Sequence, residues 1–270
     1  MQTDRSTDGG GMIEATGLSC SYGGVAAVVD VSFRVEQGEL LALVGDSGCG
    51  KTTTLKMINR LVEPDAGCVL VDGRDTATLE PHALRRSIGY VFQGTGLFPH
   101  LTVAENVAVP LRLLGWARER VAERVAEVLS LVELDASQAE RRPAALSGGQ
   151  QQRVGVTRAL AASPRVMLLD EPFGALDPLT RDRLQQSFHA LRHRLGLTAV
   201  FVTHDVAEAV VLADRVGVMR AGRLVQIDTP DAIARRPADA DVERLIDTPR
   251  RQARLVAARL EPGEPAGGTP

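Results

Sequence analysis

A glycine-rich stretch between an apolar run and a helical segment has the residue types needed to hold phosphate. Gly45-Asp-Ser-Gly-Cys-Gly-Lys51-Thr52 fits the pattern G-x-x-x-x-G-K-[ST]. Glycines let such a loop curl so that backbone N–H groups face the phosphates, and the following helix adds its positive N-terminus. Lys51 is predicted to reach the β- and γ-phosphates, and the Thr52 hydroxyl to hold Mg²⁺. Rather than an ordinary turn, the pattern predicts a nucleotide site formed by Gly45, Asp46, Ser47, Gly48, Cys49, Gly50, Lys51, Thr52 and Thr53.

Two adjacent acids, Asp170 and Glu171, follow a second apolar run, Val166-Met-Leu-Leu. Ligands of open α/β sheets bind beyond the carboxyl ends of the strands. We expect Asp170 to hold Mg²⁺ through water and Glu171 to take a proton from the attacking water as a general base. An acidic pair by itself is more often a turn or a helix cap, but the phosphate loop upstream reverses that preference.

The elements that must position these residues alternate between strand and helix. Continuous apolar runs at 40–44, 166–169 and 198–202 are typical of buried parallel strands. Short strands are predicted over 12–44, and a hairpin from the runs at 216–219 and 224–227. Helices are predicted over 51–61, 101–135, 178–195 and 205–213, with Asp177-Pro178 as cap and first residue of the third. The alternation indicates an α/β fold with a parallel core sheet.

Composition excludes several classes of protein. The 270 residues are 44% hydrophobic, and a net charge of −3 gives no basic footprint for nucleic acid. No apolar run approaches the ~18 residues of a membrane span, and the polar start has no signal-peptide core, so we expect a cytosolic protein. The three cysteines lack metal-ligand spacing and are expected to be reduced thiols.

The stretch Leu146-Ser-Gly-Gly-Gln-Gln-Gln-Arg153 closely resembles the signature motif of ABC ATPases. The order of phosphate loop, Gln93, signature, Asp170-Glu171 and His204 has that family's spacing, and the resemblance covers roughly residues 12–246. It implies a P-loop NTPase with a RecA-like parallel core sheet, an antiparallel β subdomain, and an α-helical signature subdomain at about 97–160.

The resemblance also implies roles for single residues. Tyr22 matches the aromatic that stacks on adenine, although alone it would more often be a packed strand residue. Gln93 matches the glutamine that touches Mg²⁺ and water, and His204 matches the switch histidine at the γ-phosphate. Catalysis would thus rest on Glu171, His204, Gln93 and Lys51, and metal binding on Thr52, Gln93 and Asp170. Groups from an opposite subunit would complete the site: Ser147, Gly148, Gly149, Gln150 and, from the D-loop Ala175-Leu176-Asp177, Asp177.

Such a protein is expected to bind ATP and Mg²⁺ and to form an ATP-sandwiched homodimer. Permease subunits would hold it at the cytoplasmic face of the membrane, with a substrate-binding protein as an indirect partner. The segment 93–116 would receive a permease helix, with Phe98, Leu101 and Trp116 either in that contact or packed internally.

Within the family the resemblance is closest to ATPases of glycine betaine, choline and carnitine importers. It rests on Met57-Ile-Asn-Arg-Leu-Val-Glu-Pro64, Gly96-Leu-Phe-Pro-His100, Trp116, Arg153-Val-Gly-Val and Phe173-Gly-Ala-Leu-Asp-Pro178. Transport of another solute such as an amino acid or polyamine, an exporter, and a soluble ABC ATPase remain alternatives. The signature argues against a P-loop kinase.

The ends of the chain are expected to lie outside the nucleotide-binding domain at 12–246. Residues 1–11 are predicted to be a flexible tail, with Met12 as a possible native start. Residues 247–270 are predicted to be an extension whose last ten, rich in proline and glycine, are disordered. The regulatory domain pair of some relatives is not expected.

Overall fold

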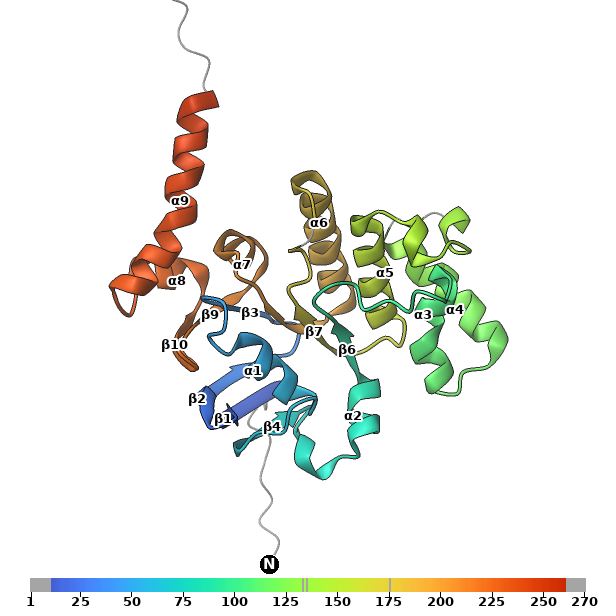
Figure 1. Cartoon of the computed structure of the whole chain (residues 1–270), viewed down its shortest axis with the longest axis horizontal. Coiled ribbons are helices and arrows are strands. Elements are labelled where there is room, and N and C mark those ends of the chain that lie inside the picture. Colours follow the sequence, from blue (N-terminus) through green and yellow to red (C-terminus); the bar gives the residue numbers. More distant parts are fainter. Residues whose placement is uncertain (1–10, 133, 135, 175, 261–270) are drawn as a thin grey trace, which may run out of the picture.

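The computed structural model describes residues 11–132, 134, 136–174 and 176–260. Strands and helices are interspersed along the chain (Figure 1). The strands are β1 (Ile13–Tyr22), β2 (Val25–Val35), β3 (Leu40–Val44), β4 (Ala66–Val71), β5 (Arg74–Asp75), β6 (Ile88–Val91), β7 (Val166–Asp170), β8 (Thr198–Val202), β9 (Arg215–Arg220) and β10 (Arg223–Asp228). The helices are α1 (Lys51–Ile58), α2 (Pro81–Ser87), α3 (Val103–Leu113), α4 (Arg118–Leu131), α5 (Gly148–Leu160), α6 (Pro178–Leu195), α7 (Val206–Leu212), α8 (Pro230–Arg235) and α9 (Ala240–Leu260).

Two sheets organise the described residues. The central sheet has the order β10-β9-β3-β8-β7-β6, in which β9, β3, β8, β7 and β6 run parallel and β10 is antiparallel to β9. A second sheet, β2-β1-β4-β5, is antiparallel throughout. The predicted parallel core sheet, antiparallel β subdomain and β9–β10 hairpin are therefore confirmed.

The two faces of the central sheet pack against different elements because side chains alternate along each strand. Leu41 and Leu43 of β3 join a core with α1 and the antiparallel sheet. Leu40, Ala42 and Val44 join the opposite core with α6 and α7. All five side chains are fully buried, which is why β3 reads as a continuous apolar run.

A third core lies in the lobe made by α3, α4 and α5, to one side of the central sheet (Figure 1). Helix α5 contributes to two of these cores: Val154 packs in the core of the helical lobe, and Val156 packs in the core between the central sheet and α6. The segment 101–135, predicted to be helical, contains two helices, α3 and α4, separated at Gly115, whose φ of 74° is left-handed. The lobe therefore contains two shorter helices in this segment rather than one long helix.

Other boundaries also differ from the predicted ones. Helix α1 ends at Ile58 rather than near 61, because Arg60 adopts a left-handed φ of 55°. Strands β1 and β2 are 10 and 11 residues long rather than short, and register shifts interrupt their pairing. Helix α9 runs through position 246, where the domain was expected to end. The predictions for residues 1–10 and 261–270 lie outside the described residues.

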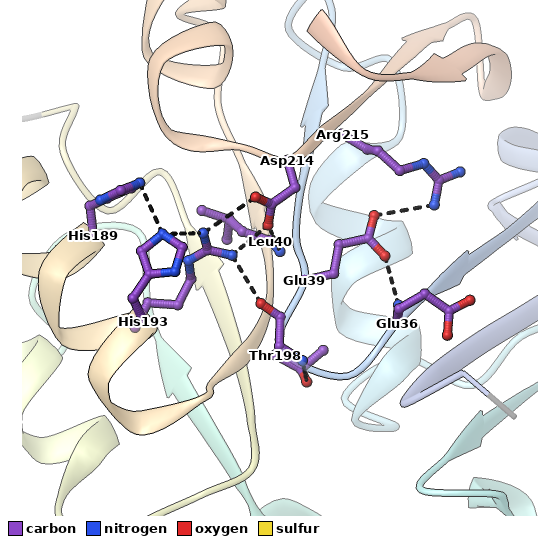
Figure 2. A network of polar contacts seen from close by, with 10 residues as sticks. Glu36, Glu39, Leu40, His189, His193, Thr198, Asp214 and Arg215 are labelled. Atoms are coloured by element: carbon purple, nitrogen blue, oxygen red, sulfur yellow. Dashed lines mark hydrogen bonds and ion pairs between the residues drawn. The ribbon is translucent and has the colours of Figure 1, made fainter. Parts of the chain in front are cut away.

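The C-terminal end of α6 is fastened to the start of β3 by a polar network (Figure 2). The buried Arg192 guanidinium donates to the Gly38 carbonyl at 3.0 Å and to the Asp214 carboxylate. That carboxylate also accepts the N–H of Leu40 at 2.8 Å. Although burial acts to raise it, these partners hold the pKa of Asp214 below its ordinary value. The network fixes the strand that leads into the glycine-rich loop.

None of the described helices combines the length and apolar character needed to cross a bilayer.

Candidate active site

The glycine-rich loop connects β3 to α1 at the carboxyl end of the central sheet. Lys51 is buried and its Nζ donates to the carbonyls of Gly45 at 2.7 Å and Asp46 at 2.9 Å. Asp46, Ser47 and Gly48 are exposed, so their backbone groups are accessible to a ligand. The loop thus presents an ammonium group, exposed backbone and a helix N-terminus together, which suits a phosphate chain.

The turn between β9 and β10 is hydrogen-bonded to this loop, a contact that could not be predicted from the sequence. The Gly222 N–H donates to the Cys49 carbonyl at 3.1 Å, and the Gly222 carbonyl accepts from Val29 of β2 at 2.8 Å. A Cβ on Gly45 would lie 2.1 Å from the Met219 carbonyl oxygen, and one on Gly50 would lie 2.4 Å from that of Ala27. These glycines are therefore required by close backbone approach as well as by their positive φ.

Asp170 ends β7 directly opposite the first turn of α1. The Thr52 Oγ1 donates to its Oδ1 at 2.9 Å. Burial raises the pKa of Asp170, while the hydrogen bond from Thr52 and the charge of Lys56 oppose that shift. A hydroxyl and a carboxylate are hard oxygen donors, and Mg²⁺ takes few protein ligands because it keeps waters and phosphate oxygens. The described residues hold no group of three His, Cys, Asp or Glu that could bind a metal ion by themselves.

Glu171 stands between two other predicted site residues. Its Oε2 accepts from Gln93 Nε2 at 3.2 Å, and its Oε1 lies 3.4 Å from His204 Nδ1. Its backbone is left-handed, with φ 45°, and its N–H donates to the Val202 carbonyl at 3.0 Å. A non-glycine residue in this region costs of order 1–3 kcal/mol and is concentrated at functional sites.

The placement of these side chains follows from the topology. Gln93 follows β6, Glu171 follows β7 and His204 follows β8, which are neighbours in the sheet. The phosphate loop follows β3, the next strand along. Parallel strands bring all their carboxyl ends to one edge of the sheet. The structure therefore brings these predicted site residues to that edge: Lys51, Thr52, Gln93, Asp170, Glu171 and His204.

The signature segment lies on the helical lobe and not with those residues. Ser147 is the N-cap of α5, where its side chain accepts from the Gln150 N–H and the Gln150 side chain accepts from the Ser147 N–H. A Cβ on Gly149 would lie 2.4 Å from the Thr180 Cγ2. In the described residues no hydrogen bond joins Ser147, Gly148, Gly149 or Gln150 to the phosphate loop.

Two further predicted contacts, Tyr22 and Asp177, lie at the ends of other elements. Tyr22, at the end of β1, exposes 52% of its surface. Asp177 is the N-cap of α6 and accepts from the Thr180 N–H at 3.0 Å. Hydrogen bonds from Thr180 lower the pKa of Asp177. Ala175, the first residue of the predicted D-loop, lies outside the described residues.

Sequence reasoning missed two buried polar groups beside the site. Tyr90 lies on β6, and burial raises the pKa of its phenol, with the charge on Asp170 adding to the shift. Glu208 on α7 is buried and accepts from Gln185 Nε2 at 2.8 Å. Glu208 lies four positions after His204 in the sequence, and this proximity was the only feature of the sequence that could have indicated a place beside the site.

A cavity of about 640 Å³ lies between the central sheet and the helical lobe. Its lining combines apolar groups, among them Phe98, Val109 and Leu113, with cationic ones such as Arg85 and Arg158. Of the three residues offered for a permease contact, Phe98 faces this cavity and is 42% exposed. Trp116 instead packs on the core of the helical lobe, with the Arg120 guanidinium 4.7 Å from its ring centroid.

The fold and the phosphate loop at the carboxyl edge of its parallel sheet define a P-loop NTPase. A family model described as ABC transporter matches residues 28–174. The chain is 50% identical over 240 residues to the choline transport ATP-binding protein OpuBA of Bacillus subtilis, covering 88% of this chain and 63% of OpuBA. It is 46% identical over 248 residues to the glycine betaine uptake system ATP-binding protein YehX of Escherichia coli, covering 92% of this chain and 80% of YehX.

A solved dimeric ATP-binding cassette bound to ADP and Pi superposes with a TM-score of 0.74 at 34% identity, over 81% of this chain and 98% of the cassette. This chain belongs to the ABC transporter family. It spans less than two thirds of OpuBA, since the match covers 63% of that relative.

Proposed function

We propose that this chain binds and hydrolyses ATP as the nucleotide-binding subunit of an ABC importer. The observation that carries the proposal is the meeting of Lys51, Asp170, Glu171, Gln93 and His204 at one sheet edge. Lys51 binds the β- and γ-phosphates in this proposal, and Thr52, Gln93 and Asp170 provide oxygen ligands for Mg²⁺. When bound, Mg²⁺ neutralises charge on the phosphates.

Glu171 is the general base of the proposed reaction. A water oxygen attacks the γ-phosphorus and gives its proton to the Glu171 carboxylate, and the bond to the β–γ bridging oxygen breaks to release ADP. Gln93 and His204 lie on opposite oxygens of Glu171 and so orient it, and His204 also contacts the γ-phosphate. Tyr22 stacks on adenine and, being exposed, is accessible to it.

The working form is a homodimer with ATP between the subunits. Ser147, Gly148, Gly149, Gln150 and Asp177 meet the nucleotide of the opposite subunit in this proposal. Two observations support this proposal. No hydrogen bond in the described residues joins these groups to the phosphate loop of their own chain, and the N-terminus of α5 at Ser147 offers N–H donors. The similar solved cassette is also dimeric.

The permease binds at the cavity between the sheet and the helical lobe. Phe92 and Gly96, on either side of Gln93 in the sequence, line this cavity. A permease helix bound there would therefore contact the segment whose Gln93 side chain donates to Glu171. The chain is thereby held at the cytoplasmic face of the membrane, and a substrate-binding protein joins the complex only through the permease.

The transported solute is a quaternary amine such as glycine betaine or choline. The names of OpuBA and YehX support this class, together with the segment from Met57 to Pro64. In that segment Arg60 donates to the carbonyls of Thr76 and Leu79, and the Asn59 side chain accepts from Leu61. Asn59 and Leu61 line the cavity, where the permease would contact them in this proposal.

Uptake of labelled glycine betaine and choline into membrane vesicles tests the proposal. The chain is co-expressed with the permease encoded beside it, and uptake is measured with and without ATP. Uptake that requires ATP and disappears in Glu171→Gln supports class and substrate together. ATP hydrolysis with a bound permease but no uptake of either compound would discard the substrate, and the absence of hydrolysis would discard the proposal.

A further inference from the structure

Arg181 lies on the first turn of α6 and is bonded to the loop before that helix. Its backbone N–H donates to the Asp177 carbonyl at 2.9 Å, and its Nη2 donates to the Leu176 carbonyl at 3.1 Å. Leu176 and Asp177 belong to the segment that faces the opposite subunit in the proposed dimer. The guanidinium is therefore hydrogen-bonded to the segment that a second copy of the chain would contact in the proposed dimer.

The other end of the same guanidinium reaches the loop that carries His204. Arg181 Nη1 lies 3.8 Å from the Asp205 Oδ2. The Asp205 Oδ1 caps α7 by accepting the N–H groups of Ala207 at 2.9 Å and Glu208 at 3.2 Å. Because the Asp205 N–H also donates to the Thr203 Oγ1 at 3.0 Å, a displacement of Asp205 carries the peptide of His204 with it.

The contacts of Arg181 are incomplete in this arrangement. Its Nε is buried without an acceptor in the described structure, and the 3.8 Å approach to Asp205 exceeds a hydrogen bond. Buried N–H groups without partners are rare in folded proteins. A movement of less than 1 Å between the two loops would close the ion pair, so this side chain has a second arrangement within reach.

We propose that Arg181 is a positioning residue that couples the dimer-facing segment Leu176–Asp177 to His204. His204 already lies beside Glu171 in the single chain. Docking of a second subunit on Leu176–Asp177 shifts the Arg181 guanidinium onto Asp205 and moves His204 into contact with the γ-phosphate of bound ATP, so hydrolysis starts only in the assembled dimer. This inference rests on the proposed function, because it requires His204 to act in hydrolysis.

The experiment measures kcat and KM for ATP in four proteins: wild type, Arg181→Met, His204→Ala and the double variant. Arg181→Met should lower kcat about tenfold to a hundredfold, because small misplacements of catalytic groups have effects of that size. KM should stay near the wild-type value, since no contact joins Arg181 to the phosphate loop in the described residues. In the His204→Ala background the same substitution should change kcat by less than about twofold, because Arg181 acts through His204.

Two further variants separate this role from a structural one. Arg183→Met removes a cation from the same helix, at an exposed side chain without a hydrogen bond in the described structure, and should leave kcat unchanged. Arg181→Lys keeps a positive charge beside Asp205 but lacks the two-pronged guanidinium that also donates to Leu176. Its kcat should therefore lie between those of Arg181→Met and the wild type. Thermal midpoints of all variants show whether a rate loss reflects unfolding.

Each outcome decides the inference. Losses that multiply in the double variant, or a loss that follows a lowered thermal midpoint, would overturn the coupling role of Arg181 while leaving the proposed function intact. A wild-type rate in His204→Ala would overturn the role assigned to His204, and this inference with it. Loss in Arg181→Met that vanishes in the His204→Ala background supports the inference.

Discussion

At the scale of single residues, Glu171 is the group that two other predicted site residues contact. Glu171 accepts from Gln93 and lies beside His204, while Asp170, its neighbour in sequence, is tied to Thr52. The two adjacent acids therefore have different partners: Asp170 is the last residue of β7, and Glu171 follows it with a left-handed backbone. In the proposed function, Asp170 holds Mg²⁺ and Glu171 takes the proton of the attacking water.

Replacing Glu171 by Gln should separate binding from hydrolysis. The amide keeps the size of the side chain but cannot take the proton, and losing a general base typically lowers rates by ~10²–10⁴. We expect nucleotide affinity close to wild type, a kcat lower by that factor, and an ATP-dependent dimer in size-exclusion chromatography. The control is Glu119→Gln, which changes an exposed acid on α4, outside the site, and should keep the rate. A Glu171→Gln protein with wild-type turnover would contradict the assignment.

Gly50 should be far less tolerant of a side chain than Gly48 in the same loop. Both have positive φ, which costs an alanine roughly 1 kcal/mol, but only a Cβ at Gly50 meets backbone, 2.4 Å from the Ala27 oxygen. Overpacking adds typically 1–3 kcal/mol. Urea unfolding should show Gly50→Ala losing at least twice the stability that Gly48→Ala loses. Equal losses would mean that β2 yields to the added methyl group.

At the scale of elements, the phosphate loop and its strand could be predicted because local sequence determines them. The run at 40–44, the glycines that follow and the helix start are all contiguous. The turn at Gly222 could not be placed against Cys49, because 173 positions separate them and spacing carries no information on such contacts. The break at Gly115 was missed because the apolar period of α4 resembles a continuation of α3.

The network at the end of α6 should make stability depend on pH. Burial and the nearby His193 and Arg192 lower the pKa of His189, with Asp214 acting in the opposite direction. Between that lowered value and the ordinary one of about 6.5, the unfolded chain binds more protons than the folded chain. The free energy of unfolding should therefore fall as pH drops from 7 through this window.

Urea midpoints at pH 7.5, 6.5 and 5.5 measure this dependence. His189→Gln should reduce the slope, because Gln does not titrate. The control His82→Gln removes a histidine from α2, away from the network, and should keep the wild-type slope. Parallel curves for wild type and His189→Gln would show that the pair His189–His193 does not contribute.

At the scale of the whole molecule, the cavity between sheet and lobe should matter for coupling and not for chemistry. Phe98→Ala removes an exposed ring from its lining without touching Glu171 or the phosphate loop. We expect the isolated subunit to hydrolyse ATP as wild type does, but to lose co-purification with the permease and ATP-driven uptake. Leu255→Ala, an exposed apolar residue on α9, is the control and should retain both. A normal uptake rate in Phe98→Ala would place the permease contact elsewhere.

The turn between β9 and β10 has a consequence for how the protein is made. The phosphate loop spans 45–52, yet it is held by Gly222, and β3 pairs with β8 and β9 from the last third of the chain. Contacts this distant in sequence form late and slow folding. During synthesis on the ribosome, which proceeds from the N-terminus, the nascent chain carries its complete phosphate-binding sequence long before it can bind nucleotide. We therefore expect the capacity to bind ATP to arise only after the β9–β10 hairpin has left the ribosome.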